Sequence, residues 1–411
     1  IGLKPEVRDY SVYVGTASPM DFNGMVRHYF LRKGPHVADI RVNLAPKEAR
    51  AEQSHEIILR LRSTLSQLAE ELGANIKLVE VPPGPPVIST VAVELYGSKA
   101  TPYSALQRAA GVLEARLNQE PFVVDVDTSV EDDQQKITFI PDREKAALSG
   151  VGALDIAQTV HLANDGLIAG YMQISSEVSP LPVVLRLPVE IRSSPNALSA
   201  LRIKGRPGIM KIREKSGLRD APRPMVSLAE LGAIRWSLQD KAIYHKNLRP
   251  VVYVFADGAG RSPAEIVLDV GSDMGKDGTR TRPMPLEGRT YLFPGSGLPW
   301  TLPAGIRAVW NGEGEWEITL RVFRDLGIAF GAALLGIFLV LRIQTGLSAI
   351  TGIIMLAIPL SVIGIMPGFW LLNQIGDRVV DGFSNPVLFT ATAMIGMIAL
   401  AGIVVRNSLI L

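Results

Sequence analysis

Residues 382–411 read GFSNPVLFTATAMIGMIALAGIVVRNSLIL and contain one charged side chain, Arg406. About 20 mostly apolar residues in a helix are enough to cross the hydrocarbon core of a bilayer. An ionisable group in such a segment is costly to place, which makes it a candidate for function. Two interpretations of Arg406 remain open. It is either a helix-end arginine that reaches the headgroups, or an interior charge that pairs with carboxylates on another helix.

Two further apolar runs precede this stretch. We therefore expect three transmembrane helices, at about 326–343, 347–372 and 384–411. The short connection 342–346 carries Arg342 and no acidic residue, which favours a cytoplasmic position. On that topology residues 1–325 are extracytoplasmic, and Arg406 lies toward the cytoplasmic half of the third helix.

The composition excludes several classes of protein. The 411 residues carry a net charge of +2, so nothing indicates a nucleic-acid partner. The chain has no cysteine, which excludes disulfides and is compatible with a periplasmic location. Because it starts at Ile1 without a signal peptide and stops inside an apolar run, we expect an internal fragment of a larger protein.

The soluble part starts with two β-α-β patterns. In the first, a helix at 53–72 places apolar side chains on one face at steps of three and four. The strands expected around it are 9–15, 37–44 and 76–81, with a long loop at 16–35 and a Pro-rich break at 81–86. The second pattern contains strand 90–96, helix 102–118 and strands 122–127 and 136–140. We expect the last two strands to pair across the acidic turn 131–133.

The sequence pattern changes after two short helices, which we expect at 142–149 and 153–164. Prolines punctuate short β-like runs over residues 171–234, which we interpret as an inserted β-rich subdomain. A helix at 263–270 follows. Residues 271–300 are rich in Gly, Pro and charge, and we expect an exposed insertion there.

Motifs of an enzyme are missing. There is no nucleophile elbow, no GxGxxG loop after a strand and no phosphate-binding loop. The five histidines lack ligand spacing, so we expect no metal site. Methionine sulfurs could bind soft metal ions along a transport path, although packing in the core and in loops is the simpler interpretation of these residues. The methionines concerned are Met20, Met25, Met172, Met210 and Met225.

Three aromatic residues, Phe22, Tyr29 and Phe30, lie in the early loop. They could line an adaptable apolar pocket for a ligand. The alternative is that they anchor the loop to its own domain.

Several stretches resemble one family, the resistance–nodulation–division (RND) efflux permeases. KITFIPDREKAALSGVGALDIAQTVHLANDG (136–166) is similar to a strand and two helices of the second C-terminal porter subdomain, and MVSLAELGAI (225–234) to the end of the docking insert. IMLAIPLSVIGIMPGFWLL (354–372) and TATAMIGMIALAGIVVRNSLIL (390–411) resemble the ninth and tenth transmembrane helices. Within the family the chain resembles the hydrophobe/amphiphile exporters.

The resemblance implies an α+β fold: tandem split β-α-β porter subdomains with a β-rich docking insert, followed by transmembrane α-helices. Residues 1–88 would be part of the first C-terminal porter subdomain. Residues 89–170 with 235–323 would form the second, 171–234 the docking insert and 324–411 the transmembrane helices.

The resemblance also implies a function and partners. It implies multidrug efflux of the acriflavin-resistance type: hydrophobic or amphiphilic compounds are exported by a multi-pass protein of the bacterial inner membrane with a large periplasmic portion. The energy source would be the proton motive force, with no cofactor and no enzymatic reaction. The partners would be two further copies in a homotrimer, a periplasmic adaptor, an outer-membrane channel, amphiphilic substrates and membrane lipids, and no nucleic acid.

Site residues follow from the same resemblance. Arg406, Asn407 and Ser408 fall at the ion-relay position of the tenth helix, which faces an aspartate pair on the fourth helix. An arginine keeps its proton, so it would exchange partners as the aspartates load protons. Phe22, Tyr29 and Phe30 fall in the loop between the access and binding pockets and would contact substrate.

Three alternatives remain. A heavy-metal cation exporter of the same superfamily would bring methionines together in the porter cleft. A non-pumping envelope protein that assists export or binds lipid would have no acidic pair opposite Arg406. In the third alternative, the 411-residue chain is functional by itself, as a soluble binding module with a membrane anchor.

Overall fold

The computed structural model describes residues 5–81, 87–206, 211–220, 223–290, 292–376 and 378–410. Contacts divide the chain into two compact units, Ile1–Glu131 with Ala242–Leu411, and Asp132–Lys241. The insert expected at 171–234 falls inside the second unit, and the domain boundaries stay a prediction. Most of the Pro-rich break and Met210 lie outside the described residues.

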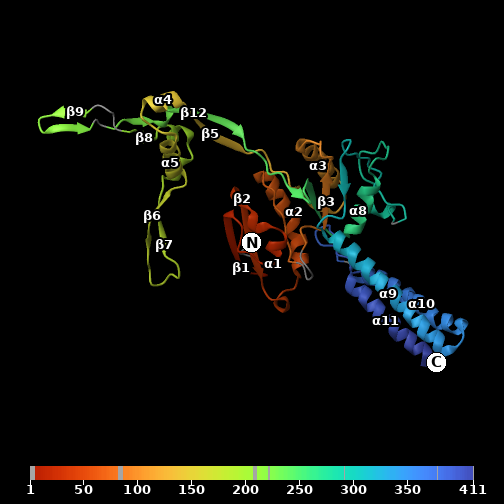
Figure 1. Ribbon diagram of the computed structural model, residues 1–411. Coiled ribbons are helices and arrows are strands. Elements are labelled where there is room, and N and C mark those ends of the chain that lie inside the picture. Colours follow the sequence, from red (N-terminus) through yellow and green to blue (C-terminus); the bar gives the residue numbers. More distant parts are fainter. Residues whose placement is uncertain are drawn as a thin grey trace. The chain divides into compact units, whose positions relative to one another are not determined.

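The first unit is built on a four-stranded antiparallel sheet with the order β16-β3-β15-β4. Its strands are β3 (Val91–Tyr96), β4 (Val123–Thr128), β15 (Val252–Gly258) and β16 (Arg307–Val309). Helices α3 (Tyr103–Asn118) and α8 (Pro263–Ser272) connect them in a β-α-β-β-α-β sequence (Figure 1). This arrangement is the split β-α-β fold, so the expected α+β class is confirmed.

The two helices form where the local sequence favours them. Ser262 caps α8 by accepting a hydrogen bond from the Glu265 N–H, and Pro263 occupies the first turn, where its missing donor is not needed. Apolar residues of α3 recur at helical spacing and pack on β3, which is buried along its whole length. The buried core of this sheet includes Leu106, Leu113, Leu117, Val93, Leu95, Val254 and Ile266.

The N-terminal part of the first unit is a hairpin with a covering helix. Its elements are β1 (Val7–Thr16), α1 (Phe22–Val26), η1 (Tyr29–Leu31), β2 (Lys33–Leu44), η2 (Lys47–Ala49) and α2 (Ser54–Leu72). The expected loop at 16–35 therefore contains two short helices. The strand expected at 76–81 is wrong: these residues are irregular, and the Lys77 ammonium donates to the carbonyls of Asp125 and Val126 at 3.0 and 2.9 Å.

The second unit joins a long ribbon to a small helical core. The ribbon pairs β5 (Gln135–Pro141) with β12 (Gly232–Leu238). The expected pairing of 122–127 with 136–140 is therefore wrong, because β4 pairs with β15, whose alternating Val252, Val254 and Ala256 complete the buried face of the other sheet.

Short elements fill the rest of the second unit. They are α4 (Arg143–Leu148), α5 (Ala153–Asn164), β6 (Leu167–Met172), β7 (Leu181–Leu185), α6 (Val189–Arg192), α7 (Pro195–Ser199), β8 (Arg202–Lys204), β9 (Lys211–Glu214), β10 (Gly217–Asp220), β11 (Met225–Ser227) and η3 (Leu228–Glu230). Ribbons form from β6 with β7, β8 with β11, and β9 with β10. The buried core of the unit lies among Ala146, Val151, Ile156, Ile203, Leu228 and Leu231.

The segment 271–300 is less exposed than its composition predicts. It contains one helical turn, η4 (Leu286–Gly288). Earlier in the chain, before β15, a small hairpin pairs β13 (His245–Lys246) with β14 (Arg249–Pro250). Ser296 and Trp300 are buried, and the Trp300 indole donates to the Val270 carbonyl at 2.7 Å. Residues 274–282 are exposed, as expected. The expectation is wrong for the end of the segment, because the Gly295 and Ser296 N–H groups donate to the buried Asp269 and Asp273 and hold it on the sheet domain.

Three helices are long and apolar enough to cross a membrane. They are α9 (Glu315–Thr345), α10 (Ser348–Gly376) and α11 (Ala391–Ile410), and they run side by side in Figure 1. Leu341, Ile358, Ala401 and Val405 form their buried contact. The first helix begins well before residue 326, because its first backbone N–H groups, at Glu315, already pair with the carbonyl of Ser89 beside β3.

Candidate functional site

The residues predicted for an ion relay lie in the last turns of α11. Val405 faces the contact with α9 and α10, whereas Arg406 and Asn407 are exposed. Ser408 donates from its hydroxyl to the Val404 carbonyl at 3.0 Å, a bond within the helix. Among the described residues, the Arg406 guanidinium has neither a hydrogen-bond partner nor an ion-pair partner. The structure thus places the three residues on one stretch of helix, and their role in a relay stays a prediction.

The aromatic residues predicted to contact substrate lie on the two short helices after β1. Asp21 caps α1, accepting from the Gly24 N–H at 2.6 Å, and Phe22, the first residue of that helix, is 64% exposed. Tyr29 lies under the Arg32 guanidinium, 5.5 Å from the ring centroid, and Phe30 meets His28 edge to face. Two of the three rings thus contact their own segment, and a contact with substrate stays a prediction.

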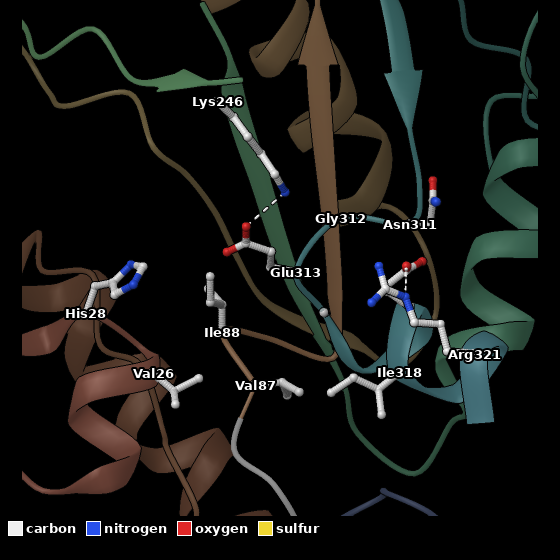
Figure 2. A pocket seen from close by; sticks show the side chains of 12 residues that line it. Val26, His28, Val87, Ile88, Lys246, Asn311, Gly312, Glu313, Ile318 and Arg321 are labelled. Atoms are coloured by element: carbon white, nitrogen blue, oxygen red, sulfur yellow. Dashed lines mark hydrogen bonds and ion pairs between the residues drawn. The ribbon is translucent and has the colours of Figure 1, made fainter. Parts of the chain in front are cut away.

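An open cavity of about 470 Å³ lies where this segment, the sheet domain and the start of α9 meet (Figure 2). Val26 and His28 come from the segment after β1, Val87 and Ile88 precede β3, and Ile318 belongs to α9. The rest of the lining is formed by Asn311, Gly312 and Gly314 and by four charged side chains: Lys246, Glu313, Glu317 and Arg321. The cavity combines an apolar floor with paired charges, and none of Phe22, Tyr29 and Phe30 is part of its lining.

The charges of the cavity are paired with one another. The Lys246 ammonium lies 2.6 Å from Glu94 and 2.8 Å from Glu313, and the Arg321 guanidinium lies 2.6 Å from Glu317. Burial alone would lower the pKa of Lys246, but hydrogen bonds to Glu313 and Glu94 outweigh it and raise that pKa above its ordinary range. Lys246 therefore stays charged and supplies a fixed hydrogen-bond donor rather than a transferable proton.

A tyrosine completes this arrangement. The Tyr96 hydroxyl donates to Glu94 at 2.7 Å, and burial together with this bond raises the pKa of Tyr96 to about 12. The Arg249 guanidinium covers the ring at 5.2 Å from its centroid, a cation–π distance. None of these residues stood out in the sequence, because isolated charged or aromatic side chains on strands and loops carry no spacing signal.

A metal site does not form within the described ranges. There, no three carboxylate, imidazole or thiolate side chains gather as ligands for an ion. Met20 and Met25 belong to the first unit, and Met172 and Met225 lie on different ribbons of the second. Each of these four side chains is exposed.

A buried network of charges was also missed by sequence reasoning. Arg116 donates to Glu120 at 2.8 Å and to Asp273 at 3.0 Å, and Arg261 donates to Glu120 at 2.7 Å. Arg289 bridges Glu120 and Asp269 and so ties segment 271–300 to the sheet domain. The network holds three guanidiniums and three carboxylates: Arg116, Arg261, Arg289, Glu120, Asp269 and Asp273.

The network is balanced in charge, and each of its three carboxylates accepts hydrogen bonds from arginine side chains. Burial alone would raise the pKa of Glu120, but hydrogen bonds from Arg261, Arg289 and Arg116 outweigh it and lower that pKa. The pKa of Asp273 is lowered in the same way, against burial, by Ser296 and Arg116. The spacing of Arg116 and Glu120, four residues apart at the end of a helix, was the signal available in the sequence.

Comparison with known proteins relates the chain to transporters. The AcrB/AcrD/AcrF family matches residues 16–276. The nickel and cobalt resistance protein CnrA of Cupriavidus metallidurans is 26% identical over 326 residues, which are 79% of this chain and 25% of that protein. The nickel-cobalt-cadmium resistance protein NccA of Alcaligenes xylosoxydans xylosoxydans is 23% identical over 325 residues, with the same shares of 79% and 25%. The chain thus spans about a quarter of the length of these relatives.

The solved structures that resemble the chain agree in fold. A crystal structure of a heavy metal efflux pump superposes with a TM-score of 0.64 at 17% identity. It covers 98% of this chain, which corresponds to 36% of the pump. The likeness therefore extends over the sheet domains and the three long helices.

Proposed function

Because the chain belongs to the AcrB/AcrD/AcrF family of RND permeases, we propose that it is part of a proton-driven efflux transporter of a bacterial inner membrane. The observation that carries the proposal is α9. Its first turn is hydrogen-bonded beside β3, and its far end packs in the bundle that includes α11 and Arg406. At 1.5 Å per residue, its 31 residues extend about 46 Å. One continuous helix thus joins the sheet domain to the helix of the predicted relay.

In the proposed mechanism Arg406 responds to protons without carrying them. Its exposed position on α11 leaves it open to carboxylates on another transmembrane helix of the full protein. When those carboxylates are charged they attract the guanidinium, and when they bind protons the attraction is lost. The resulting shift of α11 against its neighbours would open and close the cavity at the start of α9.

For the cargo, we favour hydrophobic or amphiphilic compounds. The cavity offers Val26, Val87, Ile88 and Ile318 beside fixed charges, a lining that suits a molecule with an apolar body and a polar end. The energy source would be the proton motive force. The partners would be two further copies in a trimer, a periplasmic adaptor, an outer-membrane channel and the surrounding lipids.

A metal cation is the second candidate cargo. The names of two relatives, CnrA and NccA, refer to nickel, cobalt and cadmium. The exposed Met20 and Met25, of which Met25 directly precedes the cavity-lining Val26, would supply soft ligands. Geometry favours this cargo less, because the described side chains offer no cluster of three hard or borderline ligands.

Transport in cells that lack their own drug and metal exporters tests the proposal. The full protein is expressed with its adaptor, and ethidium accumulation and Ni²⁺ tolerance are measured with and without a protonophore. We expect lower ethidium accumulation, reversed by the protonophore, and unchanged Ni²⁺ tolerance. Protonophore-sensitive Ni²⁺ tolerance alone would select the metal cargo. No effect on either probe, in cells with normal amounts of the protein, would contradict the efflux function.

A further inference from the structure

A second connection joins the membrane helices to the sheet domain, besides α9. The turn between α10 and α11, which we call the 380–387 turn, lies against the loop between β15 and α8. Gly260 of that loop has a φ of +74°, and a Cβ there would overlap the Ser384 carbonyl oxygen and come within 2.9 Å of its carbon. Two backbones therefore touch at a position where a side chain would be excluded by both conformation and space.

An aromatic pair extends this contact. The rings of Phe122 and Phe383 meet edge to face with centroids 6.1 Å apart. Phe122 has a φ of +58°, which is unusual for a residue with a side chain. Its carbonyl accepts from the Ala259 N–H at 2.9 Å, so the ring and the Gly260 loop belong to one local structure. A strained backbone conformation of this kind persists only where the surrounding structure fixes the residue, and such residues cluster at functional sites.

Both sides of the contact are held firmly. On the membrane side, Val380 and Phe383 exchange backbone hydrogen bonds of 2.8 and 2.9 Å. The Asn373 side chain of α10 binds both the N–H and the carbonyl of Val387, at 2.7 and 3.2 Å. On the sheet side, Arg261 follows Gly260 directly and is anchored in the buried charge network. A displacement of the turn would therefore move the loop rather than deform it.

We propose that the contact of Ser384 and Phe383 with Gly260 and Phe122 transmits movement of α11 to the four-stranded sheet. The inference rests on the proposed function, in which α11 shifts as the pairing of Arg406 changes. The two connections reach different strands. The first turn of α9 meets the sheet beside β3, whereas the 380–387 turn meets the start of β4 and the end of β15. The four contacting residues are positioning residues, since they act through α11.

Amide hydrogen exchange in the full protein, reconstituted in lipid nanodiscs, tests the inference. The perturbation is Arg406→Ala, introduced into the wild type, a Gly260→Ala background and a Gly275→Ala background. Gly275 is the matched control, because its φ of +72° imposes the same backbone strain while a Cβ would meet no atom within 4 Å. Exchange is followed in residues 91–96, which report on α9, and in 123–128 and 252–262, which report on the 380–387 turn.

We expect Arg406→Ala to change exchange in all three reporters, by about 2- to 30-fold, in the wild type and the Gly275→Ala protein. In the Gly260→Ala protein the change should persist at 91–96 and disappear at 123–128 and 252–262. A change that persists in all three segments would overturn the inference. So would a change that is absent at 123–128 and 252–262 in the wild type.

A second variant protects the test against misfolding of Gly260→Ala. Phe383→Ala removes the ring contact without a clash, and Phe293→Ala, at a residue that is 80% exposed, is its control. Only Phe383→Ala should weaken the response at 123–128, and equal responses in the two would overturn the inference. The readout does not depend on cargo. If the otherwise wild-type protein exports ethidium normally but Arg406→Ala changes no exchange at 123–128, the coupling alone is contradicted. If Arg406→Ala changes exchange there as expected but the wild type transports neither probe, the proposed function alone is contradicted.

Discussion

Two groups of charges in this chain differ in how they are satisfied. Around Glu120, three guanidiniums and three carboxylates are buried and bonded to one another within the chain. On α11, Arg406 is exposed and lacks such partners within the part of the chain that the structure describes. A buried charge network that is complete fixes a structure, since removing any member leaves an uncompensated charge. A lone charge on a membrane helix fixes nothing by itself and is available to respond to other charges.

The largest expected effect comes from removing the lone charge. In the full protein, Arg406→Ala should reduce protonophore-sensitive ethidium export to background, because no charge is left to respond to the carboxylates. Arg406→Lys, which keeps the positive charge, is the control and should retain most of the export. Normal export by Arg406→Ala would show that this arginine is only a headgroup anchor, and the contrast between the two groups would then break down.

Removing a member of the complete network should affect stability instead. Glu120→Gln leaves Arg261 and Arg289 without their shared carboxylate, which should lower the free energy of unfolding of the sheet domain by about 3–5 kcal/mol. Thermal unfolding of the purified protein measures the loss. Arg321→Ala removes an exposed pair and is the control, with an expected cost of about 0.3–0.5 kcal/mol. Similar costs for the two variants would contradict the structural role of the network.

Acid should weaken the network gradually, with a smaller effect than Glu120→Gln. Arginine bonds lower the pKa of Glu120, and serine and arginine bonds lower that of Asp273, both against burial. A lowered carboxyl pKa stabilises the fold above the unfolded-state pKa, and this contribution is lost as pH falls through the folded-state value. The difference in melting temperature between the wild type and Asp273→Asn should therefore be constant near pH 7 and shrink below about pH 4. A difference that stays constant down to pH 3 would show that Asp273 does not titrate in this range.

Local pattern predicted most of the elements. The helices at residues 54–72, 103–118 and 263–272 form close to where the sequence predicted them, at 53–72, 102–118 and 263–270, and the three long apolar helices follow their composition. The pairing of the strands was harder to predict from the sequence than the positions of the helices. Residues 122–127 and 136–140 are neighbours in sequence, yet β4 pairs with β15 more than a hundred residues away, because the split β-α-β fold places the third strand between the first two.

Long-range contacts also decided the candidate sites. Lys246 pairs with Glu94 and Glu313 across 152 and 67 positions, and no local spacing predicts such a set. Segment 271–300 looked exposed because Gly, Pro and charged residues are typical of loops. Arg289 and the Gly295 N–H of this segment nevertheless bind the buried Asp269 of α8, and the Ser296 N–H binds Asp273, the residue that caps the end of α8.

The sequence by itself determined that part of this chain belongs in a membrane and that one arginine there is exceptional, because hydrophobic length and isolated charge are local properties. It also indicated the family through short motifs. Only the tertiary structure decided which charges are partners, how α9 joins the sheet to the bundle, and that Gly260 touches the turn before α11. Those features depend on residues that the fold brings together from distant positions, and a one-dimensional pattern contains no distance between them.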